Sequence, residues 1–148
     1  MEFQHTSVLL HETVDALRVS PGGLYLDGTL GGGGHSREIL ARGGCVVGID
    51  RDAEAIAAAC ARLAEYGARF TAIRGNFHDA KALVQGPLDG ALLDLGVSSH
   101  QLDVRERGFS YHDDAPLDMR MDADAPLTAA DIVNDWPPEE IARILREY

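Results

Sequence analysis

Short apolar runs and segments with helical spacing alternate along most of the chain. Four short apolar runs predict strands at 24–26, 45–49, 69–74 and 90–95. Apolar residues at helical spacing predict helices at 8–17, 35–41, 52–66 and 80–85. Because strands alternate with helices, we expect an α/β fold, a doubly wound Rossmann-like parallel sheet with strand order 3-2-1-4.

Two of these helices have distinct apolar faces. The helix at 8–17 has Ser7 as its predicted N-cap, and its face consists of Val8, Leu9, Val14 and Leu17. The helix at 52–66 ends at Gly67, and its stripe consists of Ile56, Cys60, Leu63 and Ala64. Cys45 and Cys60 fall on a predicted buried strand and helix, so we expect free core thiols of a cytosolic protein.

The residues after the fourth strand change character. Residues 96–127 are dense in charge and have no sustained period, which predicts a long ordered loop or lid. Helices are predicted at 128–136 and 138–148, with Pro138 at a first helical position. The stripe of the second helix consists of Ile141, Ile144, Leu145 and Tyr148. We expect a ligand-binding domain at 1–127, lid included, and the start of a helical substrate-recognition insertion at 128–148.

A doubly wound sheet of four strands is short for its class. The fourth strand would be left as an exposed edge that needs a partner. We therefore expect an incomplete sheet in the N-terminal portion of a longer protein. A homodimer is the other way to cover that edge.

The segment 24–50 has the clearest local pattern. A strand ends at Asp27, four glycines follow at 31–34, and a short helix leads to a second strand that ends at Asp50. This order is one βαβ unit of a nucleotide-binding sheet. Glycines let the backbone turn sharply and lie against a ligand, and an acid at the second strand end meets ribose hydroxyls.

The glycine spacing distinguishes between two nucleotide cofactors. A dinucleotide fingerprint would need a third glycine at position 36, where the chain has Ser36. The looser pattern of S-adenosylmethionine (SAM) enzymes, an acid followed by alternate glycines, fits Asp27, Gly31 and Gly33 better. Thr29 replaces the first glycine of that pattern. The spacing therefore favours SAM.

The stretch 94–99 follows the fourth strand and is the best candidate for chemistry. Methylation of an exocyclic amine needs acceptors for the amine N–H groups, since the nitrogen lone pair is delocalised into the ring. Asp94 and Ser98 are therefore the candidate catalytic residues. The alternative is that Asp94 caps the strand or holds the methionine part of the cofactor, and both readings stay open.

Charge limits the choice of partners. The formal net charge is −11, whereas a nucleic-acid binder usually shows a basic face. Either the chain binds no nucleic acid, or its basic surface is local, or that surface lies in sequence absent here. No apolar run approaches the length of a membrane span, and residues 1–12 do not form a signal peptide.

The charged lid allows three interpretations. Its aspartates could bind a hard cation, although the histidines and cysteines have no metal-ligand spacing. We favour an acidic lid whose aspartates pair with Arg105, Arg107 and Arg120. Phe109 and Tyr111 either stack on a flipped-out base or pack the lid onto the sheet, and we expect packing for one of them.

Five motifs in this order resemble the MraW/RsmH family: HTSVLLHETV, DGTLGGGGHSREIL, GIDRDAEAI, LLDLGVSSHQLDVRERGFSY and APLDMRMD. They span residues 5–122. The resemblance implies a SAM-dependent methyltransferase that modifies the N4 amine of a cytosine in 16S rRNA of the small ribosomal subunit, in the cytoplasm. It implies cofactor contacts at Gly33, Gly34, His35, Asp50, Phe77, Asp94 and Gln101. Gln101 follows from the resemblance alone.

The chain also departs from its relatives. Members of the family are about twice this length. Related amine methyltransferases have prolines after the acid, where this chain has Leu95 and Gly96, so the catalytic role of Asp94 is an analogy. Two other functions remain: a SAM-binding fragment that is inactive on its own, and a nicotinamide-dependent oxidoreductase.

Overall fold

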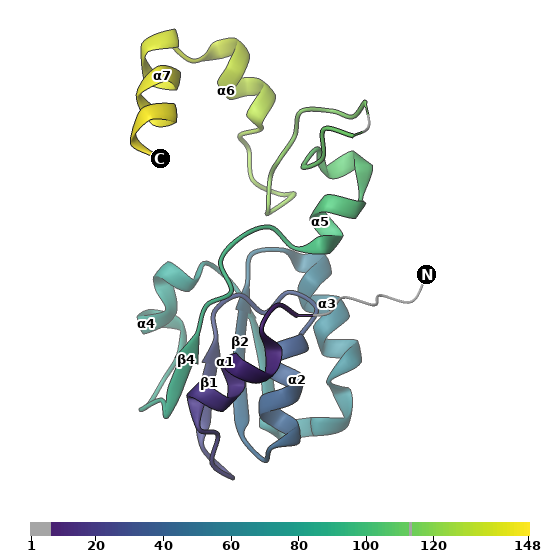
Figure 1. Ribbon diagram of the computed structural model, residues 1–148, viewed down its shortest axis with the longest axis vertical. Coiled ribbons are helices and arrows are strands. Elements are labelled where there is room, and N and C mark those ends of the chain that lie inside the picture. The colour runs from purple at the N-terminus through teal and green to yellow at the C-terminus, as the bar shows by residue number, and fades with distance from the viewer. Residues whose placement is uncertain (1–6, 113) are drawn as a thin grey trace. The chain divides into compact units, whose positions relative to one another are not determined.

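The computed structural model describes residues 7–112 and 114–148 (Figure 1). The chain divides into two compact units, Met1–Gly96 and Val97–Tyr148, and each is described by itself.

The first unit is built on a parallel sheet of four strands in the order β3-β2-β1-β4, which confirms the predicted order. The strands are β1 (Leu24–Asp27), β2 (Cys45–Asp50), β3 (Phe70–Arg74) and β4 (Gly90–Leu92). In the register, Asp27 lies opposite Gly48 of β2 and Leu92 of β4, and Asp50 lies opposite Arg74 of β3. The order reverses between β1 and β4, so the ends of these strands meet where ligands bind in such sheets.

Helices pack on the sheet through one apolar core. The helices of this unit are α1 (Leu10–Leu17), α2 (Gly34–Ala41), α3 (Ala53–Arg62) and α4 (Ala80–Leu83), with 3-10 turns η1 (Ala64–Arg69) and η2 (Phe77–Asp79). Helix α1 packs beside α2, and α2 and α3 lie along β2 and β3 (Figure 1). The buried cluster consists of Val14, Tyr25, Ile39, Leu40, Val46, Leu63 and Leu92.

The predicted start of the first helix was wrong. Helix α1 begins at Leu10, and its N-cap is Leu9 in a left-handed conformation rather than Ser7. Val8 and Leu9 are mostly exposed, whereas Val14 is buried. Ser7 is buried against Gly34 instead, where an added Cβ would lie 2.0 Å from the Ser7 hydroxyl oxygen. The segment before α1 therefore packs on the start of α2.

The face of α3 agrees with the prediction at Leu63, which is buried, and differs from it at Cys60 and Ala64, which are exposed. The helix ends at Arg62. Ala59 and the C-cap Leu63 are buried. Cys60 is exposed and Cys45 half-buried; both thiols are free, as expected, but Cys60 is not a core residue. In a helix so rich in alanine, apolar contrast between faces is weak, which explains the error of one position.

Strand β4 ends at Leu92, three residues before the predicted end. The Leu92 carbonyl accepts the N–H of Gly28, and the N–H of Asp94 donates to the Thr29 hydroxyl. These bonds direct the chain across the loop that follows β1, and Leu93 and Leu95 become exposed. Asp94 therefore lies in the turn beyond the strand.

The second unit contains more helix than predicted. The lid includes α5 (Ser99–Asp103) and η3 (Arg105–Arg107), and α6 (Ala129–Asp135) and α7 (Pro138–Glu147) follow. Pro138 occupies the first turn of α7 as expected. The apolar stripe of α7 is not a buried face, because Leu145 and Tyr148 are exposed. The functional division at residue 127 remains a prediction.

Candidate functional site

The glycine loop between β1 and α2 is a tight backbone turn. Gly31 has φ +49° and Gly33 has φ +76°, values that favour glycine. The loop is tied to the end of β2 by the Leu30 N–H, which donates to the Ile49 carbonyl at 3.0 Å. At Gly32 an added Cβ would meet only the far end of the Arg62 side chain, at 3.7 Å. The loop thus offers bare backbone to a ligand.

Asp50 lies where the sequence predicted, at the end of β2. One carboxylate oxygen accepts the Gly31 N–H at 2.7 Å, and the other accepts the Asp52 N–H at 2.9 Å. A carboxylate oxygen has two lone pairs, so each retains one for a ligand hydroxyl. Asp50 therefore orients the glycine loop and remains a possible ribose acceptor.

Asp27 and Ser36 form a buried pair beneath the loop. The Ser36 hydroxyl donates to Asp27 Oδ2 at 2.7 Å, and the Thr29 N–H donates to Oδ1 at 3.2 Å. Both side chains are almost fully buried. Burial raises the pKa of Asp27, although the bonds from Ser36 and Thr29 act in the opposite direction. The position that lacks the third glycine of a dinucleotide fingerprint is thus a buried hydrogen-bond donor to Asp27.

Thr29 bonds Asp94 to the same loop, and His35 lies near the Asp94 carboxylate. The Asp94 N–H donates to the Thr29 hydroxyl at 2.7 Å. His35 Nδ1 lies 3.9 Å from Asp94 Oδ2, and Nε2 lies 3.2 Å from the Val8 carbonyl oxygen. If Nε2 carries the proton it donates to that carbonyl, which leaves Nδ1 facing Asp94. The threonine that departs from the glycine pattern is therefore the anchor of Asp94.

Phe77 completes the strand-end residues of the first unit. It opens η2 after β3 and is partly exposed. A Cβ on Gly28 would lie 3.2 Å from Phe77 Cβ and 2.4 Å from Leu93 Cδ2. Phe77 and Leu93 therefore close around Gly28. The first unit brings together the glycine loop, His35, Asp50, Phe77 and Asp94.

Ser98 and Gln101 belong to the second unit and bind each other. The Ser98 hydroxyl accepts the Gln101 N–H at 3.1 Å, and Gln101 Oε1 accepts the Ser98 N–H at 3.0 Å. This reciprocal pair is a capping box at the start of α5, a signal readable as Ser-x-x-Gln in the sequence. Their cofactor and catalytic roles remain predictions.

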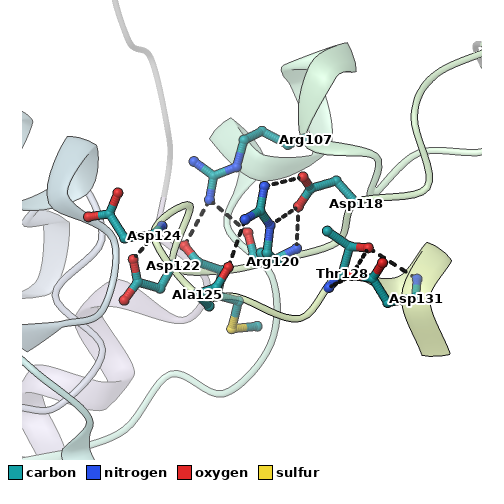
Figure 2. Close-up of polar contacts among 9 residues, drawn as sticks. Arg107, Asp118, Arg120, Asp122, Asp124, Ala125, Thr128 and Asp131 are labelled. Carbon is teal, nitrogen blue, oxygen red and sulfur yellow. Dashed lines mark hydrogen bonds and ion pairs between the residues drawn. The ribbon is translucent and has the colours of Figure 1, made fainter.

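The lid arginines form contacts within the second unit, and Figure 2 shows those of Arg107 and Arg120. Arg120 donates twice to Asp118 and once to the Ala125 carbonyl, and Arg107 donates to the carbonyls of Arg120 and Met121. Arg105 donates to the Asp114 carbonyl. The hydrogen bonds from Arg120 lower the pKa of Asp118. The expected pairing with an aspartate side chain is thus seen for Arg120, and Arg105 and Arg107 also bind backbone carbonyls.

The two lid aromatics differ in exposure. Phe109 is half-buried, and Tyr111 is 91% exposed with its ring 4.4 Å from that of His112.

Among the described residues, no cluster of three or more histidine, cysteine, aspartate or glutamate side chains is arranged to hold a metal ion. The helices described in the structure include none with the length and apolarity to cross a membrane.

The fold of the first unit is that of class I Rossmann-like methyltransferases. The C-terminal domain of precorrin-6Y C5,15-methyltransferase from Rhodobacter capsulatus matches 67% of this chain and 55% of its own, with TM-score 0.56 and 24% identity. A Streptococcus mutans protein in complex with SAH matches 63% of this chain and 55% of its own, with TM-score 0.53 and 18% identity.

The chain belongs to the MraW methylase family, whose model matches residues 2–148. It is similar to the ribosomal RNA small subunit methyltransferase H of Symbiobacterium thermophilum, with 57% identity over 100% of this chain and 49% of the relative. The enzyme of the same name from Heliobacterium modesticaldum is 53% identical over 100% of this chain and 50% of its own length. The chain thus spans about half the length of these curated relatives.

Proposed function

We propose that this chain is the cofactor-binding part of a SAM-dependent methyltransferase that modifies the N4 amine of a cytidine in 16S rRNA. The observation that carries the proposal is the convergence of the glycine loop, Asp50 and Asp94 in a chain of the MraW methylase family. The names of the relatives point to small-subunit ribosomal RNA as substrate. The proposed partner is therefore the small ribosomal subunit, in the cytoplasm.

The strand-end residues fit the cofactor. The ribose would bind to the free lone pairs of Asp50, and Gly33 and Gly34 would contact the rest of the molecule through their backbone. His35, Phe77, Asp94 and Gln101 are the further proposed contacts. A protein of similar fold was solved with SAH, which supports a cofactor of this class.

The proposed chemistry needs a group that accepts a hydrogen bond from the cytosine amine and then its proton. Bound SAM supplies a methyl group on a sulfonium, a leaving group that needs no activation. The half-exposed Asp94 carboxylate would accept an N–H of the cytosine amine and then receive its proton as the nitrogen–carbon bond forms and the carbon–sulfur bond breaks. Ser98 is the second proposed catalytic residue, because its hydroxyl accepts the Gln101 N–H and still has a hydrogen to donate.

Two alternatives come from different classes. A nicotinamide-dependent oxidoreductase is disfavoured because the third glycine position is the buried Ser36, bonded to Asp27. A SAM-binding module without activity agrees with the same cofactor residues, and only a turnover measurement separates it from an enzyme. In our proposal residues 1–127 bind the cofactor and 128–148 begin the substrate-recognition region.

A hybrid protein tests the proposal. These 148 residues would replace the matching half of the Symbiobacterium relative, and the hybrid would receive unmodified small subunits and SAM with a labelled methyl group. We expect label in N4-methylcytidine after digestion of the RNA to nucleosides. Label in another nucleoside would refute the cytosine assignment. Binding of NAD but not SAM in calorimetry would refute the methyltransferase.

A further inference from the structure

The C-terminal end of helix α3 contacts the glycine loop. The Arg62 guanidinium, at the end of α3, donates from Nη1 to the Gly32 carbonyl at 2.9 Å. Below the same loop, a Cβ on Gly33 would lie 3.0 Å from Leu63 Cδ1 and 3.4 Å from Ala59 Cβ. Three residues near the C-terminal end of α3 therefore contact the loop: Ala59 and the C-cap Leu63 by packing, and Arg62 by a charged hydrogen bond.

The opposite edge of the loop is fixed by Asp50. Asp50 Oδ2 accepts the N–H of Gly31, while Arg62 donates to the carbonyl of Gly32, the next residue. The two charged groups thus hold one N–H and one C=O of adjacent glycines. Glycine has no side chain to restrict its own backbone, so a run of four glycines depends on such external contacts for a fixed conformation.

We propose that Arg62 is a positioning residue, which fixes the glycine loop in its ligand-ready conformation through the Gly32 carbonyl. The inference rests on the proposed function, since the ligand of the loop is taken to be SAM. Without Arg62 the loop would sample more conformations before binding, and the ligand would have to order it. Arg62 itself does not touch the reacting atoms.

The test compares variants of one surface arginine with a matched control. Arg62→Met keeps the aliphatic part and removes the donor, and Arg62→Lys restores a charged donor. Arg42→Met removes the same charge from an arginine that pairs with Asp15 and Glu38 on α1 and α2. The readouts are SAM affinity by calorimetry, thermal midpoint without ligand, and amide exchange at Gly31 and Gly33.

We expect Arg62→Met to raise the SAM dissociation constant by about threefold to tenfold, the scale of a partly exposed charged hydrogen bond. Exchange at Gly31 and Gly33 should accelerate in the absence of ligand, and Arg62→Lys should recover most of both effects. The thermal midpoint should fall no more than in Arg42→Met, which should leave loop exchange and SAM affinity unchanged.

Failure of the positioning role of Arg62 can be distinguished from failure of the cofactor proposal. Unchanged loop exchange in Arg62→Met would overturn the positioning role, as would an equal change in Arg42→Met. Absence of SAM binding in the unaltered chain would overturn the cofactor proposal, and amide exchange would still decide the role of Arg62 by itself.

Discussion

Single residues around the glycine loop serve both the fold and the proposed ligand. Asp50 accepts two backbone N–H groups and Thr29 anchors the N–H of Asp94. The buried Asp27 carboxylate accepts the Ser36 hydroxyl and the Thr29 N–H. Substitutions at these residues therefore change the loop as well as its contacts, and each experiment needs a control for loop structure.

For Asp50→Ala we expect SAM affinity to fall by roughly 1.5–3 kcal/mol, the range for hydrogen bonds to a charged group. The ribose hydroxyls would lose their acceptor, and the Gly31 N–H would lose its partner. Calorimetry with SAM measures the change, and Glu65→Ala, at an exposed acid of η1, controls for the loss of one negative charge. Equal affinity in Asp50→Ala and the unaltered chain would remove Asp50 from the site.

Asp27 gives a prediction about pH. Its pKa is raised in the folded chain, so the folded state binds more protons than the unfolded state as pH rises through the interval between the ordinary and the raised pKa. Stability contributed by the protonated form is lost in that interval. Asp27→Asn stays neutral, and its amide can still accept from Thr29 and donate to the Ser36 oxygen.

The free energy of unfolding of Asp27→Asn relative to the unaltered chain should therefore rise with pH, by about 1.4 kcal/mol for each unit by which the pKa is raised. Urea unfolding of both proteins between about pH 4 and pH 7 measures this difference. A difference that is independent of pH would show that Asp27 is not destabilised by burial in the folded chain.

At the scale of elements, the alternation of strands and helices was enough to predict the sheet order. The residues at strand ends followed from that order, which is why the positions of Asp50 at the end of β2 and Phe77 after β3 could be predicted from the sequence. The end of β4 was not predictable, because it depends on tertiary bonds from Leu92 to Gly28 and from Asp94 to Thr29. Ser7 was read as a local cap, but it is buried against Gly34, a contact distant in sequence.

The lid gives a prediction at the same scale. Gly108, with φ +71°, follows η3, and an added Cβ would lie 2.3 Å from the Pro116 carbonyl oxygen and 2.8 Å from the Asp118 nitrogen. Both atoms are backbone, so they cannot rotate away. Gly86→Ala is the matched control, because Gly86 has φ +89° with open space around it.

In both alanine variants the free energy of unfolding should fall by about 1–2 kcal/mol, because alanine is strained in the left-handed conformation. In Gly108→Ala it should fall further than in Gly86→Ala, because the added Cβ clashes with backbone atoms. Urea unfolding measures the loss of stability in each variant, and amide exchange over residues 105–121 shows whether the loss in Gly108→Ala arises in the lid. Equal losses, with unchanged exchange in the lid, would show that the backbone of the lid accommodates a side chain at Gly108.

At the scale of the whole chain, the net charge bears differently on the proposed cofactor and on the proposed RNA partner. The proposed cofactor residues of the first unit include Asp50 and Asp94, which are bonded to the same glycine loop, whereas the formal net charge of −11 repels phosphate. Of the lid arginines, Arg120 is paired with Asp118, and Arg105 and Arg107 hold carbonyls, so they contribute to the lid before any RNA binds.

We therefore expect these 148 residues to bind SAM but to methylate RNA inefficiently, because the chain spans about half of its relatives and its visible surface is acidic. Titration with SAM tests the first part. For the second, unmodified small subunits and labelled SAM are given to this chain and, in parallel, to the complete Symbiobacterium relative. Comparable turnover would contradict the prediction, since it would mean that these 148 residues hold the RNA by themselves and that the paired arginines of the lid rearrange to meet phosphate.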